Sequence, residues 1–252
     1  MKEIDARIKV LEEEINDIWN NGKSEDSRKG DVGEAFVGHA IKQSIFDKGY
    51  KISEKGNGTA RIYKQVNSNK QGRGGIDFNV EYTDDKGNSD VILIEVKNLG
   101  DYPLSKQDYD EKVKDRFDKL DPLNNKKRIL AIPEHQTKYK NIRDECPKDK
   151  ITVIPIDQQL TDDTIKNGEL DATFKDFKEN LDKYIDEIIP DINKQKNESI
   201  EDDLKQGKEI NVVGKKWEKS DGHIRNIASR LDIPDRRKRP WKVISYIRYE
   251  EI

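Results

Sequence analysis

The sequence has 252 residues, enough for one sizeable domain and a smaller second one, and it is unusually polar, with 39% charged and 32% hydrophobic residues. No apolar run approaches the roughly 18 residues that cross a bilayer, so we expect no membrane partner. The single Cys146 excludes a disulfide framework and a cysteine-based zinc site, which favours a reducing, cytoplasmic location. The formal net charge of −3 argues at first sight against a nucleic-acid partner.

The first predicted element is a helix over residues 3–20. Its apolar residues recur at alternating spacings of four and three, in an a/d pattern: Ile4, Ile8, Leu11, Ile15 and Ile18. The stripe fits two arrangements equally well, a dimerisation helix or a helix that packs on its own domain. We treat residues 1–22 as a separate N-terminal segment.

The second predicted helix covers residues 31–47. Glu34 lies on the same helical face as Gly38, Ile41 and Ile45, which follow it by four, seven and eleven residues. A carboxylate on an apolar face is costly to bury unless a cation, a metal or a hydrogen-bond donor meets it. We therefore expect a buried and partnered Glu34; the alternative is a helix rotated so that Glu34 reaches water.

An alternation of strands and helices follows. Residues 51–75 carry six bases and one acid. Short apolar strands separated by helices indicate a sheet that is covered on both faces. The predicted elements are a strand near 60–66, a hairpin of strands 76–83 and 91–97, a helix over 106–120, a strand at 128–132, a helical stretch near 138–146 and a strand at 151–156.

The C-terminal part of the chain differs in charge. Residues 161–207 have fourteen acids and seven bases, and an amphipathic helix through Phe174 and Ile185 is expected there. Residues 210–252 have eleven bases and six acids. We expect an acidic helical connector over 161–207 and a small, mainly helical basic module over 208–252, with helices around Ile224–Leu231 and Trp241–Ile247.

The hairpin carries the most informative polar residues. Glu95 and Lys97 project to the same face of their strand, because side chains alternate along a strand. If the hairpin is symmetric about Gly87, Asp77 pairs with Lys97 and faces the same surface. Two carboxylates are suited to a hard divalent cation such as Mg²⁺, and a neighbouring ammonium can orient a water or stabilise developing charge. The alternative is a half-exposed hairpin that merely carries charges.

These residues resemble the core motif of the PD-(D/E)XK nuclease superfamily. The matching segments are Gly75-Ile76-Asp77 and Glu95-Val96-Lys97, and Gly33-Glu34 looks like the additional Glu that a preceding helix often supplies in that family. Ile76 stands where the Pro of the motif's name would be. The resemblance covers about half of the chain and implies a restriction-endonuclease-like α/β/α core with a mixed central sheet, over residues 23–160.

The resemblance also implies an activity. It assigns Asp77 and Glu95 as ligands of Mg²⁺, with Mn²⁺ as a substitute, Glu34 as a further ligand, and Lys97 to the attacking water. The expected function is therefore Mg²⁺-dependent hydrolysis of DNA by a restriction-type endonuclease. A structure-specific nuclease of the junction-resolving or repair type, and a non-catalytic DNA-binding protein on a nuclease-like fold, are the alternatives. Cutting both strands would need two copies, so we expect a homodimer.

Basic side chains in the C-terminal module, and one in the basic segment before Asp77, are expected to contact DNA phosphates. The alternative for the C-terminal residues is a solvated charge run. Basic residues are in excess at 51–75 and 210–252, and acidic residues at 161–207. The small net charge is therefore a sum over regions of opposite charge and does not exclude DNA as a partner. The candidate DNA-binding residues are Arg73, Lys215, Lys216, Arg225, Arg230, Arg236, Arg237, Lys238, Arg239 and Lys242.

Overall fold

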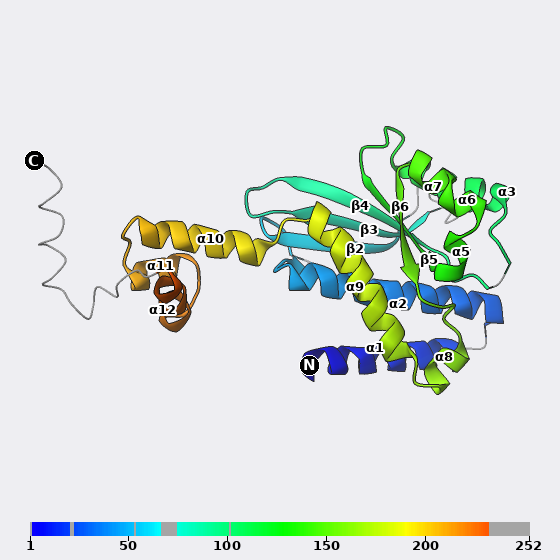
Figure 1. Ribbon diagram of the computed structural model, residues 1–252, viewed down its shortest axis with the longest axis horizontal. Coiled ribbons are helices and arrows are strands. Elements are labelled where there is room, and N and C mark those ends of the chain that lie inside the picture. The colour runs from blue at the N-terminus through cyan, green and yellow to red at the C-terminus, as the bar shows by residue number, and fades with distance from the viewer. Residues whose placement is uncertain (1, 21–22, 53, 67–74, 101, 232–252) are drawn as a thin grey trace, which may run out of the picture. The chain divides into compact units, whose positions relative to one another are not determined.

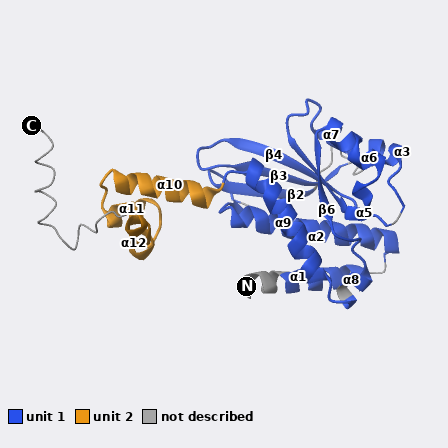
Figure 2. Ribbon diagram, viewed as in Figure 1, with its two compact units in different colours: residues 1–190 blue, residues 191–252 orange. Residues whose placement is uncertain are grey.

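The computed structural model describes residues 2–20, 23–52, 54–66, 75–100 and 102–231. The chain divides into two compact units, Met1–Pro190 and Asp191–Ile252 (Figure 2). The acidic segment expected as one connector over 161–207 therefore belongs to both units. The reason is its apolar faces: the helix through Phe174 and Phe177 is buried in unit 1, whereas Ile200 and Leu204 belong to the core of unit 2.

Unit 1 is an α/β structure built on a mixed sheet. In the described residues the sheet has six strands in sequence order, β1 to β6. The strand pairs β2–β3 and β3–β4 are antiparallel, and the pairs β1–β2, β4–β5 and β5–β6 are parallel. The strands are β1 (Lys51–Ile52), β2 (Thr59–Val66), β3 (Ile76–Thr83), β4 (Ser89–Val96), β5 (Lys127–Pro133) and β6 (Ile151–Ile156).

Helices α1 (Lys2–Asn20), α2 (Glu25–Asp47), α8 (Asp162–Lys166) and α9 (Leu170–Ile188) lie on one side of unit 1 (Figure 1). The ring of Phe36 in α2 packs against Phe174 and Phe177 of α9, with ring centroids 5.4 Å apart in both pairs. Helix α2 begins earlier than expected because the side chain of Ser24 caps it by accepting a hydrogen bond from the Ser27 amide.

Helix α1 packs on its own chain. Leu11 and Ile15 are completely buried, Ile8 is nearly so, and Glu14 pairs with His39 of α2 at 2.8 Å. Of the two arrangements that fit the a/d stripe, the structure shows packing within the chain. A homodimer stays a prediction. Ile8, Leu11 and Ile15 of the stripe are buried within the chain, so they are not available as a dimer interface.

The opposite face of the sheet is covered by short helices (Figure 1). The predicted helix over 106–120 contains a π-helical turn in its middle, and its Tyr109, Val113 and Phe117 form a core with Leu93 and Leu130 of the sheet. The buried Cys146 belongs to the same core. The helices are α3 (Lys106–Tyr109), the π-helical η1 (Asp110–Lys114), α4 (Asp115–Leu120), α5 (Glu134–Thr137), α6 (Lys140–Arg143) and α7 (Glu145–Lys148).

The described part of unit 2 consists of α10 (Ile192–Lys205), α11 (Ile210–Lys216) and α12 (Asp221–Arg230). Ile200, Leu204, Val213 and Ile224 are among the residues of its hydrophobic core. The helix expected around Trp241–Ile247 lies outside the described residues. No helix among the described residues is long and apolar enough to cross a membrane.

Candidate active site

The β3–β4 hairpin places Asp77 opposite Glu95. The antiparallel ladder pairs Phe78 with Ile94, and the same register continued by one step sets Asp77 against Glu95. The predicted pairing of Asp77 with Lys97 is therefore wrong by two residues. Because side chains alternate with a period of two, this shift leaves all three side chains on the face that was expected.

The register differs because the turn is shorter than the sequence indicated. The carboxylate of Asp84 accepts hydrogen bonds from the amides of Lys86 and Asn88, at 2.9 and 2.8 Å. These bonds close the connection at Asn88, and Ser89 and Asp90 become part of β4. The centre of the hairpin thus moves one position toward the N-terminus.

Asp77 and Glu95 are both buried carboxylates. Glu95 is completely buried and Asp77 is 8% exposed. Asp77 Oδ2 accepts a hydrogen bond of 2.7 Å from the Val96 amide, so this side chain continues the ladder where the backbone pairing ends. Lys97 Nζ donates to Glu95 Oε1 and, at 3.2 Å, to the carbonyl of Val96. The structure thus brings Asp77, Glu95 and Lys97 together at the end of the hairpin.

Arg116 of α4 is a fourth member of this cluster. Its Nη1 lies 2.5 Å from Glu95 Oε1 and 3.9 Å from Asp77 Oδ1. The residue was missed in the sequence, although a signal was present. Arg116 follows Tyr109 by seven residues and Val113 by three, so it stands on the apolar face of the predicted helix, as Glu34 does on its own helix.

A buried ion pair fixes α4 over the sheet. Arg128 of β5 is 2% exposed, and its guanidinium binds the carboxylates of Asp118 at 2.8 Å and Asp121 at 3.1 Å. It also donates to the Asp121 carbonyl at 2.6 Å. These bonds join the end of α4 to the strand beside β4, and so hold Arg116 above Glu95.

The cluster is electrostatically unusual. Burial raises the pKa of Glu95 to about 8, although Lys97 and Arg116 oppose the rise. Glu95 Oε2 is buried without a hydrogen-bond partner in the described part of the chain. An acceptor left unsatisfied in the interior costs roughly 1–3 kcal/mol, and such costs concentrate at functional sites.

The donor set of this cluster fits a hard divalent cation. Mg²⁺ is usually held by one or two carboxylates, with waters and substrate phosphates completing its shell. Asp77 and Glu95 supply two carboxylates, and the second oxygen of Glu95 lacks a donor. Among the described residues, no three His, Cys, Asp or Glu side chains gather closely enough to hold a metal by themselves.

Glu34 does not complete a three-carboxylate metal group with Asp77 and Glu95 among the described residues. It lies on α2, whose Gly33 and Gly38 come close to Val96 and Phe78. Its side chain is 17% exposed, and its Oε2 lies 3.7 Å from Lys64 Nζ of β2. The sequence predicted a buried and partnered carboxylate; the structure shows a partly buried one that has a lysine as partner. Its role as a metal ligand stays a prediction.

Asn98 secures the end of β4 directly after Lys97. Its Nδ2 donates to the carbonyls of Lys29 and Leu160, at 2.9 and 2.8 Å, and its Oδ1 accepts from the Leu160 amide at 2.8 Å. One side chain therefore ties β4 to α2 and to the segment after β6. It limits how far the backbone beside Lys97 can move.

Four of the expected DNA-binding residues are described, and all lie in unit 2. Lys215, Arg225 and Arg230 have exposed side chains. Lys216 is exposed as well, but its ammonium donates to the buried Asp203 at 2.7 Å and lies 4.6 Å from the centroid of the Trp217 ring. Arg225 also has a partner, Asp221 of the same helix at 3.9 Å. The remaining candidates lie outside the described residues: Arg73, Arg236, Arg237, Lys238, Arg239 and Lys242.

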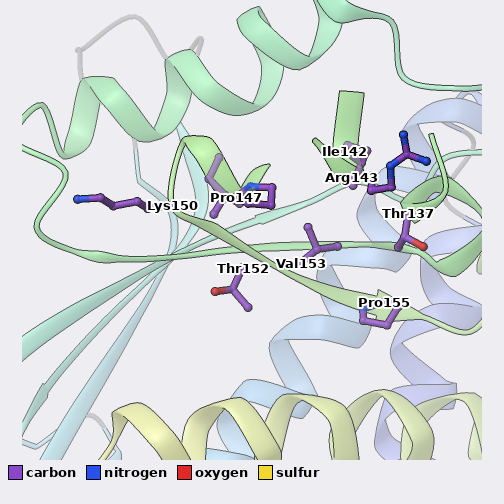
Figure 3. A pocket seen from close by; sticks show the side chains of 9 residues that line it. Thr137, Ile142, Arg143, Pro147, Lys150, Thr152, Val153 and Pro155 are labelled. Carbon is purple, nitrogen blue, oxygen red and sulfur yellow. The ribbon is translucent and has the colours of Figure 1, made fainter. Parts of the chain in front are cut away.

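A pocket of about 710 Å³ lies beside the edge strand β6, with Thr137, Arg143, Lys150 and Val153 among its lining residues (Figure 3). Asp77, Glu95 and Lys97 do not line it. The candidate site is therefore distinguished by its buried charges.

No family model matches the chain, and no curated protein or solved structure matches it either. The chemistry of the site is therefore derived from its own residues. Two buried carboxylates and two cations meet at one end of a sheet. This arrangement can bind a cation or a phosphate and can stabilise developing negative charge.

Proposed function

We propose that this chain is a Mg²⁺-dependent endodeoxyribonuclease of the restriction type, with a restriction-endonuclease-like core in unit 1. The observation that carries the proposal is the completely buried Glu95, which has an orphaned oxygen and lies opposite Asp77 with Lys97 bound to it. A protein that only needed a stable sheet would gain by an apolar residue here, since buried ion pairs seldom add net stability. Retaining the charges has a reason if they perform chemistry.

The arrangement assigns a task to each side chain. Asp77 and Glu95 would hold the cation, which, when bound, polarises the phosphate and lowers the pKa of a water. Lys97 keeps its ammonium beside Glu95 and can orient the attacking water. Arg116 faces both carboxylates and can pair with a phosphate oxygen, for which a guanidinium is well shaped.

The topology of unit 1 supports the same proposal. Helix α2 precedes the β3–β4 hairpin, and the α3–α4 segment, β5, α5–α7 and β6 follow in that order. This is the order of elements that the resemblance to the PD-(D/E)XK superfamily implies for its core. Because one cluster serves one phosphodiester, we propose a homodimer for cleavage of both strands.

One observation favours a second candidate, a DNA-binding protein without catalysis. The Arg116 guanidinium already neutralises Glu95 and reaches toward Asp77. A permanent ion pair would occupy the carboxylates that a cation needs. The two candidates differ in whether the Arg116 guanidinium moves away from the carboxylates when a divalent cation binds.

Cleavage assays with supercoiled, linear and branched DNA, in Mg²⁺, Mn²⁺ or EDTA, test the proposal. The enzyme should cut linear duplex into defined fragments with Mg²⁺ and not with EDTA. Asp77→Asn, which keeps an acceptor for the Val96 amide, and Glu95→Gln should each abolish cutting. Asp157→Ala, at an exposed aspartate directly after β6, is the matched control and should cut normally.

Each other outcome has a definite meaning. Cutting only at branches would replace the restriction role with a structure-specific one. DNA binding without cutting in either metal would favour the non-catalytic candidate. Activity retained by Asp77→Asn would refute the assignment of the site.

A further inference from the structure

The arrangement of α11 and α12 is specific. Helix α11 has seven residues, α12 has ten, and the four residues 217–220 connect them. The Lys219 amide donates to the Gly214 carbonyl at 2.9 Å, and Glu218 adopts a positive φ of 53°. These features end α11 sharply. The Ser220 hydroxyl then caps α12 by accepting from the His223 amide at 3.2 Å.

The turn between the two helices folds closely against α11 at Gly214. A Cβ atom added there would lie 2.9 Å from the Lys219 carbonyl oxygen and 3.7 Å from Ile224 Cγ1. Only glycine allows this approach without a shift of the backbone. Two short helices joined by a turn of three or four residues, often with a glycine, are the parts of a helix-turn-helix. Helix α10 completes the core from the other side, through Ile200 and Leu204.

Helix α12 has one buried and one exposed face. Ile224, Ile227 and Ala228 are buried in the core of unit 2. We call the exposed face of this helix the α12 face; its side chains are His223, Arg225, Asn226, Ser229 and Arg230.

The chemistry of the α12 face is that of base recognition. Asparagine can bond adenine through two hydrogen bonds, arginine can do the same with guanine, and serine and histidine both donate and accept. Asp221, in the first turn, is the one acidic residue of α12, and it lies 3.9 Å from the guanidinium of Arg225. The rest of the helix, from Gly222 to Arg230, contains none, in a chain with 51. An ordinary solvated helix of this protein looks different, since α9 exposes Asp176, Glu179, Asp186 and Glu187.

We propose that α11 and α12 form a helix-turn-helix and that the α12 face reads bases in the major groove of duplex DNA. In this motif the second helix enters the groove and its partner crosses the backbone. Lys215, exposed near the end of α11, is placed to contact a phosphate. The inference deepens the proposed function and rests on it in one respect, that DNA is the partner.

Selection from a random duplex library with the full chain in EDTA tests this inference without cleavage. A short motif should be enriched. Asn226→Ala should weaken binding to the selected duplex by tenfold or more, in line with the typical value of a bidentate base contact, and leave binding to a scrambled duplex within about twofold. The matched control, Asn167→Ala at an exposed asparagine of unit 1, should bind both duplexes normally.

Lys215→Ala serves as the contrast. A phosphate contact carries no sequence information, so this change should weaken binding to both duplexes equally. It should also reduce the slope of log K against log[salt] by about one. Circular dichroism should show unchanged helix content in both variants, since both side chains are exposed.

Three results would overturn the inference: enrichment of no motif, an equal loss of affinity for the selected and the scrambled duplex in Asn226→Ala, or a preference for RNA over DNA. Failure of the proposed function looks different. A chain that selects a motif but never cuts DNA would refute the proposed nuclease activity and support base recognition by the α12 face. A chain that cuts DNA but selects no motif would support the nuclease activity and refute base recognition by the α12 face.

Discussion

Arg116 Nη1 lies 2.5 Å from Glu95 Oε1, and this contact joins a helix on one face of the sheet to a completely buried carboxylate. Lys97 binds the same oxygen, so two cations share one acceptor. The pair holds α4 against β4, and it opposes the rise in the pKa of Glu95 that burial causes, without cancelling it.

Arg116→Met should destabilise unit 1, because it removes a charged hydrogen bond from a buried acceptor. The expected loss is about 1–3 kcal/mol in the free energy of unfolding, measured by urea denaturation at pH 7. Arg116→Lys should lose less. Lys119→Met, three residues on, breaks only an exposed pair with Asp115 and should cost less than about 0.5 kcal/mol. If Arg116→Met and Lys119→Met lowered the free energy of unfolding equally, the contact of Arg116 with Glu95 would contribute no more to stability than the exposed pair of Lys119 with Asp115.

The sequence predicted much of unit 1, and its omissions have physical causes. Short apolar runs between polar connections located β3 to β6, because the composition of a strand is a local property. The hairpin register was displaced because the side chain of Asp84 decides where the turn closes. Arg116 was overlooked because its partner, Glu95, is 21 residues away in the sequence and is brought near only by packing.

Unit 2 shows the same limit. The apolar spacing of Ile224, Ile227 and Ala228 located α12. The turn before it depends on Glu218 at positive φ and on the close approach at Gly214, neither of which periodicity reveals. The bond from Lys216 to Asp203 spans thirteen residues, so the sequence did not reveal it; the role of Lys216 as a DNA contact stays a prediction.

Gly33→Ala should destabilise the junction of α2 and β4. The added Cβ would lie 2.9 Å from Asn98 Cβ and 3.3 Å from Val96 Cγ1, so one of the two elements must move. Overpacking of this kind costs roughly 1–3 kcal/mol. Gly30→Ala in the same helix meets nothing within 4 Å and should stabilise it by up to about 1 kcal/mol. Thermal denaturation of the two variants should therefore shift the midpoint in opposite directions.

Acid should unfold unit 2 through Asp203. Burial by itself raises the pKa of this carboxyl, but bonds from Lys208, Lys216 and the Trp217 indole together outweigh burial and hold the pKa well below its usual range. A depressed folded-state pKa gives stability that is complete above the unfolded value near 3.8 and is lost as the pH falls below it. The NMR signal of the Trp217 indole N–H, which donates to Asp203 at 2.8 Å, should disappear in that range.

Asp203→Asn should weaken unit 2 at pH 7 by roughly 1–3 kcal/mol and make it less sensitive to acid, because the titrating group is gone. Asp202→Asn alters the exposed neighbouring aspartate and should leave the pH profile unchanged. If both variants kept the acid transition of the wild type, another group would control it.

Asn98 should tolerate neither loss nor change of its amide. Asn98→Ala leaves the carbonyls of Lys29 and Leu160 without their donor, and should lower the free energy of unfolding by about 2–4 kcal/mol, since several buried groups lose partners at once. Asn98→Asp has the same shape, but its oxygen would face both carbonyls. It should therefore be at least as unstable as the alanine variant at pH 7, measured by urea denaturation. An aspartate variant as stable as the wild type would contradict donation from the Asn98 amide to these two carbonyls.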